Sequence, residues 1–128
     1  MNIVYVVLYN FLFHPLFIFS MFFLSIFNKK IRQGIIGRFE SLYILKNYFS
    51  KNNLNSNIIW FHCSSLGEYM QAEPLIDSLK NREKSCTVLV SFFSPSGFEN
   101  VKNSNIDCKV YLPFDFPWTV NSLFEIVR

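Results

Sequence analysis

A short polar segment, Ser64-Ser-Leu-Gly-Glu68, follows an apolar run and contains residue types that could do chemistry. Ser65 precedes Glu68 by three residues, the spacing at which a serine caps a helix and the glutamate reaches back to the serine N–H. A capping box is therefore one interpretation. The other is catalytic, because a carboxylate in the first helical turn stays ionised and can take a proton from a hydroxyl. Gly67 would let a substrate approach the backbone closely.

A nucleophilic serine is disfavoured in this segment. The Gly-x-Ser-x-Gly elbow is absent, and His62 lies within the preceding apolar run instead of across a cleft from Ser64 or Ser65. We interpret His62 as a histidine that supports the core or the loop. Glu68 is then the candidate catalytic residue, with Ser65 and Gly67 as candidate substrate-binding residues.

Two later turns also lead into predicted helices. In the first, Ser94 is a natural N-cap and Pro95 occupies the first helical position, so that free N–H groups near Ser96 and Gly97 could bind an anionic or sugar group. In the second, we interpret Asp115 as a helix cap. The sequence has no Gly-x-Gly-x-x-Gly, no Walker motif and no metal-binding cluster, so we expect neither a metal nor another cofactor.

These polar segments follow apolar runs whose length is typical of buried strands. Strands are predicted at 58–63, 86–93 and 108–112, and helices at 66–81, 95–102 and 117–127. This alternation predicts an α/β fold with a partial doubly wound, parallel, Rossmann-like sheet. Ligands bind at the carboxyl ends of such strands, where the three polar loops would meet. Pro74 predicts a kink in the first of these helices.

The N-terminal segment has the composition of a membrane anchor. No charged residue occurs from Ile3 to Phe27, and this run as a helix would cross a hydrocarbon core of about 30 Å. Basic residues at 29–32 place its end on the cytoplasmic side. We predict a transmembrane or membrane-anchor helix at 1–27. Pro15 interrupts the run, so an anchor lying in the interface is the alternative.

Residues 28–57 are predicted to be a basic juxtamembrane connector, and 58–128 a partial domain. The connector's apolar residues recur at helical spacing, which predicts an amphipathic helix on the bilayer or against the body, and the polar stretch 50–57 predicts a loop. The net charge of +3 comes from the connector. A basic collar on a mildly acidic body indicates a membrane-surface protein and excludes a nucleic-acid-binding arm.

The three cysteines have no paired spacing and are expected to be reduced core thiols.

Three segments together resemble a known family. Trp60–Ile76, Phe92–Glu99 and Tyr111–Asp115, in this order behind an apolar anchor, look like the N-terminal domain of 3-deoxy-D-manno-octulosonic acid (Kdo) transferases. The resemblance implies the N-terminal, acceptor-side half of a GT-B glycosyltransferase at the cytoplasmic face of a bacterial inner membrane. It further implies transfer of Kdo from CMP-Kdo to a hydroxyl of the lipid A precursor without a metal, with Glu68 as the general base.

The family also has a second α/β domain that holds the nucleotide sugar, and no such domain occurs in these residues. We therefore expect the chain to be inactive alone, as a truncated reading frame, as a split half whose partner is a separate C-terminal half, or as a remnant. The hypothesis from another class is a membrane-anchored, non-catalytic α/β binding or scaffold module. In that module Glu68 would be only a helix cap.

Overall fold

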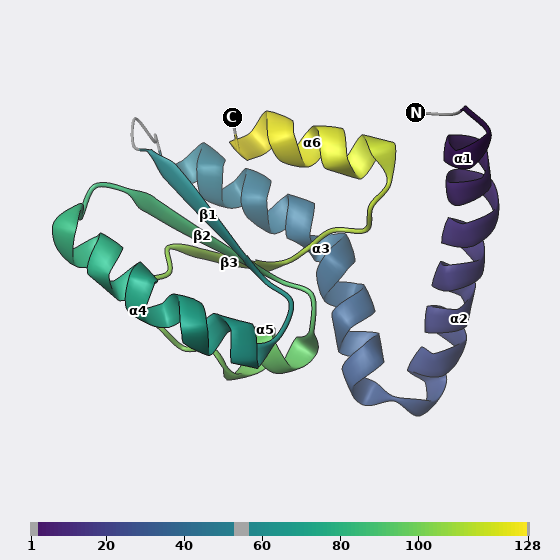
Figure 1. Cartoon of the computed structure of the whole chain (residues 1–128), viewed down its shortest axis with the longest axis horizontal. Coiled ribbons are helices and arrows are strands. Elements are labelled where there is room, and N and C mark those ends of the chain that lie inside the picture. Colours follow the sequence, from purple (N-terminus) through teal and green to yellow (C-terminus); the bar gives the residue numbers. More distant parts are fainter. Residues whose placement is uncertain (1–2, 53–56, 128) are drawn as a thin grey trace.

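A small parallel sheet lies between two layers of helices in the computed structural model, which describes residues 3–52 and 57–127 (Figure 1). The helices α3 and α6 cover one face of the sheet, and α4 and α5 cover the other. The elements in chain order are α1 (Ile3–Leu8), η1 (Tyr9–Phe13), α2 (His14–Phe27), α3 (Lys29–Lys51), β1 (Ile58–Cys63), α4 (Leu66–Arg82), β2 (Thr87–Phe92), α5 (Pro95–Asn100), β3 (Cys108–Tyr111) and α6 (Pro117–Val127).

The three strands run parallel in the order β1-β2-β3, so each strand lies beside its neighbour in the sequence. Ile58 pairs with Thr87 at one end of the first ladder and Cys63 with Phe92 at the other. Every residue of the central strand β2 is buried. The predicted α/β alternation and parallel sheet are thus confirmed. Within the described residues the strand order does not reverse, although helices cover both faces.

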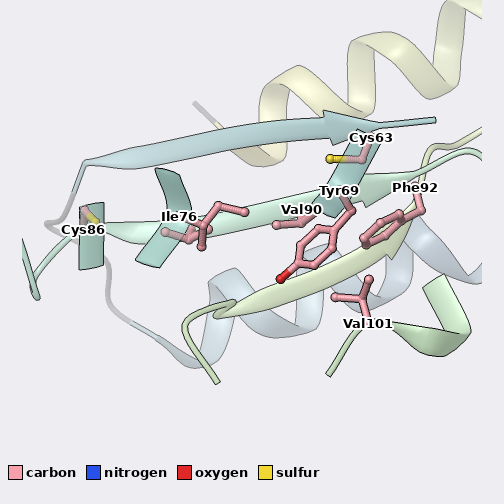
Figure 2. Close-up of a cluster of buried hydrophobic side chains, with 8 residues drawn as sticks. Cys63, Tyr69, Ile76, Cys86, Val90, Phe92 and Val101 are labelled. Carbon is pink, nitrogen blue, oxygen red and sulfur yellow. The ribbon is translucent and has the colours of Figure 1, made fainter. Parts of the chain in front are cut away.

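The first hydrophobic core lies between the sheet and the helices α4 and α5. Alternate residues of β2 point to this side, as the pleat of a strand requires, and Val90 and Phe92 there contact the buried Tyr69 and Ile76 of α4 (Figure 2). Burial on both faces explains why β2 is mainly apolar, with Thr87 and Ser91 as its polar residues. The core also holds α4 in place, and the first turn of α4 carries the candidate catalytic residue Glu68.

The second core lies on the opposite face, where α3 and α6 pack. Leu45 of α3 is fully buried with Leu89 of β2, Val110 of β3 and Leu123 of α6. The amphipathic helix that we expected on the bilayer or against the body therefore packs against the body. This core includes residues before Ile58, where we expected the domain to begin. The domain bounds themselves stay a prediction.

The predicted loop at 50–57 begins later than expected. Ser50 and Lys51 belong to α3, because Asn52 ends the helix by donating hydrogen bonds from both its backbone and its side-chain nitrogen to the carbonyl of Tyr48. Residues 53–56 lie outside the described residues.

Gly37 shows how closely α3 approaches the sheet, because a Cβ atom at this position would overlap the buried ring of Tyr111. We expect Gly37→Ala to lower the free energy of unfolding by about 1–3 kcal/mol, since overpacking outweighs the gain in helix propensity. Gly67→Ala is the matched control, because a Cβ there would have only the Ser65 hydroxyl nearby, at 3.9 Å. Urea denaturation of both variants measures the difference. Equal stabilities would show that α3 does not pack as described.

The N-terminal apolar run forms consecutive helices, α1, η1 and α2, with a π-helical turn before Pro15. The His14 N–H reaches back five residues to the carbonyl of Tyr9. Proline has no N–H to donate to the carbonyl four residues before it. The wider π-helical turn accommodates the missing hydrogen bond, and the helix continues. From Tyr9 to Phe27 the helix is long and apolar enough to cross a membrane, and its side chains are mostly exposed. At the other proline in a helix interior, Pro74, α4 likewise continues.

The cysteines lie in or beside the strands and are buried as free thiols, which confirms the expectation for Cys63, Cys86 and Cys108. Burial raises the pKa of the Cys108 thiol to about 11, and the nearby Asp107 charge adds to this. Burial likewise raises the pKa of Cys63, with a smaller contribution from Glu68. A raised pKa keeps the thiols of Cys63 and Cys108 protonated and lowers their nucleophilic character.

Candidate functional site

Backbone hydrogen bonds hold the three polar loops side by side at the carboxyl edge of the sheet. The Ser94 N–H donates to the carbonyl of Ser64 at 2.9 Å, which joins the first loop to the second. The Leu112 N–H donates to the carbonyl of Phe92 at 2.8 Å, which joins the third strand's exit to the second. The parallel sheet therefore brings together loops that are about fifty residues apart in the sequence.

Glu68 lies in the first turn of α4 with an exposed side chain. Ser65 caps this helix, its hydroxyl accepting from the Glu68 N–H at 3.3 Å. The carboxylate reaches back as expected, but it accepts from the N–H of Ser64 at 2.6 Å and not from that of Ser65. The single bond to Ser64 orients the carboxylate, and its other oxygen has no partner among the described residues. The group can therefore be both a cap and a proton acceptor.

Gly67 leaves open space beside this carboxylate. Gly67 is exposed, and a Cβ atom added to it would have only the Ser65 hydroxyl nearby, at 3.9 Å. An acceptor molecule could therefore approach the backbone next to Glu68 without meeting a side chain. The structure thus groups Ser65, Gly67 and Glu68 at the N-terminus of α4, where Gly67 and Glu68 are exposed. Their roles toward a substrate stay predictions.

The second loop contributes Ser96 and Gly97, but in different environments. Ser94 caps α5 as expected, accepting from the Gly97 N–H at 3.3 Å, and its hydroxyl also bonds to that of the exposed Ser96 at 2.9 Å. Gly97 is buried, and a Cβ there would overlap the Phe92 ring and lie 3.4 Å from the Leu66 nitrogen. The glycine therefore allows the first two loops to pack closely. Substrate binding by Ser96 and Gly97 stays a prediction.

Two other polar residues of the loops have partners that explain them. His62 is exposed at the end of β1, where its Nδ1 lies 2.9 Å from the hydroxyl of the buried Ser91, so it supports the strand ends. The cap expected at Asp115 is not formed, because the Phe116 N–H before α6 bonds to the Thr119 hydroxyl instead. Asp115 accepts a hydrogen bond from Tyr9 in the N-terminal helix at 2.9 Å.

Arg38 is a polar residue near these loops that sequence reasoning missed. Only 6% of it is exposed, and its guanidinium donates to the carbonyls of Gly34 at 2.9 Å and Phe93 at 2.6 Å. Its carbon also lies 4.5 Å from the centre of the Phe93 ring. The arginine thereby ties α3 to the second loop. The signal in the sequence was a basic residue on the helix face shared with Ile35 and Leu45.

Metal chemistry finds no support in the side chains that the structure describes. Among residues 3–52 and 57–127, no group of three or more His, Cys, Asp and Glu side chains could hold a metal ion.

Comparison with known proteins finds a matching family model and several similar proteins. The model of the family described as 3-deoxy-D-manno-octulosonic-acid transferase (kdotransferase) matches residues 37–128. The chain is 31% identical over 89 residues to the 3-deoxy-D-manno-octulosonic acid transferase of Aquifex aeolicus, and 31% identical over 72 residues to that of Haemophilus influenzae. A bifunctional glycosyltransferase/methyltransferase of Fusobacterium nucleatum is 30% identical over 74 residues. No solved structure matches the chain.

These matches cover a small part of each relative. The aligned segments span 66%, 55% and 55% of this chain, and 24%, 17% and 11% of the Aquifex, Haemophilus and Fusobacterium proteins respectively. The chain thus spans about a quarter or less of the curated relatives it matches.

Proposed function

Because this chain belongs to the 3-deoxy-D-manno-octulosonic acid transferase family, we propose that it is the acceptor-side part of a glycosyltransferase that transfers Kdo. The donor is CMP-Kdo and the acceptor is a hydroxyl of the lipid A precursor. In this proposal the three-stranded sheet belongs to the N-terminal domain of a GT-B fold. A C-terminal half supplies the nucleotide-sugar site, and the present chain does not transfer Kdo without it.

The observation that carries this proposal is the position of Glu68. Its carboxylate is exposed at the carboxyl end of β1, oriented by the Ser64 N–H and bordered by the open surface of Gly67. An ionised carboxylate in this position can accept a proton from an incoming hydroxyl. A buried or inward-facing carboxylate could not.

The chemistry assigned to Glu68 is general base catalysis. As the acceptor hydroxyl gives its proton to the carboxylate, its oxygen forms a bond to the anomeric carbon of Kdo. The bond from that carbon to the phosphate oxygen breaks, and CMP leaves with the electron pair. The positive end of α4 favours the ionised carboxylate before proton transfer. Ser65 caps the helix N-terminus, and in this proposal Ser96 and Gly97 at the start of α5 bind the substrate.

Membrane attachment through α1, η1 and α2 is the second part of the proposal. These helices expose large apolar side chains, and the basic cluster 29–32 follows directly. Tyr9 bonds to Asp115 and the His14 ring contacts Phe116, so the N-terminal half of the anchor lies beside the body. A helix crossing the bilayer would have to break these contacts, so they favour an anchor in the interface at the cytoplasmic face.

The test is Kdo transfer by membranes that carry this chain, with and without a separately expressed C-terminal half of a family member. CMP-Kdo and lipid A precursor are added, and the Kdo-bearing product is measured by mass spectrometry. We expect product only when both halves are present. The C-terminal half expressed by itself is the control.

Two outcomes would contradict this proposal. Product from the chain alone would show that the donor site lies within it. Binding of the acceptor without product in any sample would instead support the non-catalytic module, in which Glu68 serves only to cap α4.

A further inference from the structure

A cavity of about 240 Å³ lies where the N-terminal helix passes the loops after β2 and β3. Its lining includes Tyr9 and His14 from the N-terminal helix, Arg38 from α3, and Phe93 and Asp115 from the two loops. Glu68 does not line it. The cavity is therefore separate from the candidate catalytic carboxylate. Within it, the buried cation Arg38 lies beside the N-terminal helix.

Arg38 forms no salt bridge with the described residues that line this cavity. The guanidinium is almost fully buried, its hydrogen bonds to Gly34 and Phe93 go to neutral carbonyls, and no carboxylate of the described residues forms a salt bridge with it. Burial lowers the pKa of Arg38, which shows the cost of keeping the charge away from water. Buried charges in proteins are normally paired. A bound anion would provide the missing partner.

His14 provides a second, independent observation. Only 5% of the residue is exposed, and its Nδ1 has no hydrogen-bond partner among the described residues. The ring is held between Tyr9, at 5.0 Å, and Phe116, at 4.8 Å between ring centres. A buried polar atom without a partner costs about 1–3 kcal/mol. An oxygen of a bound anion would accept a hydrogen bond from Nδ1–H and remove this cost.

Asp115 is the negative group of the cavity wall, and its environment is compatible with an anion nearby. Its side chain is exposed to solvent, and its Oδ2 accepts the hydrogen bond from the Tyr9 hydroxyl. Solvent and this bond screen the carboxylate, whereas Arg38 and His14 are buried. The anion therefore belongs on the inner side of the cavity.

A larger cavity of about 880 Å³ adjoins the first, and Tyr9, Phe13 and Asp115 line both. Its wall is mainly apolar, with Leu12 and Leu16 from the helix. We propose that the two cavities together bind a lipid whose headgroup is a phosphomonoester, with its phosphate between Arg38 and His14 and its hydrocarbon chain in the larger cavity. The forked donors of arginine suit the oxygens of a phosphate. This site does not depend on Glu68 or on glycosyl transfer.

The experiment uses the full chain in neutral detergent, titrated separately with dihexanoyl phosphatidic acid, dihexanoyl phosphatidylcholine and inorganic phosphate. The chain has two histidines, so His14 reports on the cavity by NMR and His62 is the internal control. We expect the His14 ring signals to shift saturably with phosphatidic acid while the His62 signals stay in place. Phosphatidylcholine should leave both unchanged, and inorganic phosphate should bind at least about tenfold more weakly because it buries no hydrocarbon.

Two variants test the residues themselves. Arg38→Gln should weaken binding of phosphatidic acid about tenfold or more, as expected for loss of a hydrogen-bonded charge. Lys30→Gln, in the exposed basic cluster, should not change it, which separates the cavity from general attraction to anionic lipid. Because Arg38 also ties α3 to Phe93, a second variant, His14→Phe, keeps the ring packing and removes Nδ1. Its weaker binding is measured by the ³¹P signal of the lipid.

Several results would overturn the proposal. An unchanged His14 signal, or an equal response to phosphatidylcholine, would show that no anion site exists. Equal affinity for inorganic phosphate would show that the larger cavity holds no hydrocarbon. If Arg38→Gln does not fold, full binding by His14→Phe would be sufficient to reject the site.

Discussion

Glu68→Gln should slow Kdo transfer by about 10²- to 10⁴-fold when this chain is combined with a C-terminal half, because the amide cannot accept the hydroxyl proton. The amide oxygen can still accept from the Ser64 N–H, so the N-terminus of α4 keeps its hydrogen bond. The fold should therefore be retained. The measurement is the turnover rate with CMP-Kdo and lipid A precursor, together with the circular dichroism spectrum of the variant.

The matched control is Glu83→Gln, an equal change at the exposed residue that follows α4 at its other end. We expect this variant to transfer Kdo at the original rate. Full turnover by Glu68→Gln would assign the carboxylate to helix capping alone, and the general base would have to be sought elsewhere. Equal losses in both variants would indicate an effect of charge on α4 as a whole.

Leu45→Ala should lower the free energy of unfolding by about 2–5 kcal/mol, since the substitution leaves a cavity between α3 and the sheet. Leu45 is fully buried, with 0% of its surface exposed, and packs in the core with Leu89 and Val110. This is a large part of the stability of a domain of this size. Urea denaturation followed by circular dichroism measures the change.

Tyr43→Ala is the control on the same helix. Tyr43 is 72% exposed, so its removal should change the free energy of unfolding by no more than about 0.5 kcal/mol. If both variants unfold alike, α3 is a separate connector and not part of the folded body. A large loss for Leu45→Ala alone would place the start of the folding unit before Ile58.

The strands and helices of the body could be predicted closely because each has a local signal. Apolar runs identified β1, β2 and β3 to within a residue or two, since a parallel strand covered on both faces is mainly apolar. Serines before the helices identified the start of α4 and α5, where their hydroxyls accept backbone hydrogen bonds. These signals act over a few residues and do not depend on the rest of the chain.

Contacts between distant segments had no such signal. The apolar face of α3 is compatible with a bilayer or with a sheet, and only packing against β3 and α6 distinguishes them. Asp115 precedes a helix, which favoured a cap, but the fold places it against Tyr9, 106 residues away. The burial of Arg38 without a salt bridge to the described residues likewise depends on every segment that surrounds it.

The sequence by itself determined the α/β order, the family resemblance and the candidate carboxylate Glu68, because apolar periodicity, caps and short motifs are properties of neighbouring residues. Only the tertiary structure decided that Glu68 is exposed, that α3 packs on the sheet, and that Arg38 and His14 share a cavity. Exposure and pairing of polar groups depend on which distant segments exclude water from them. That information arises only when the chain is folded.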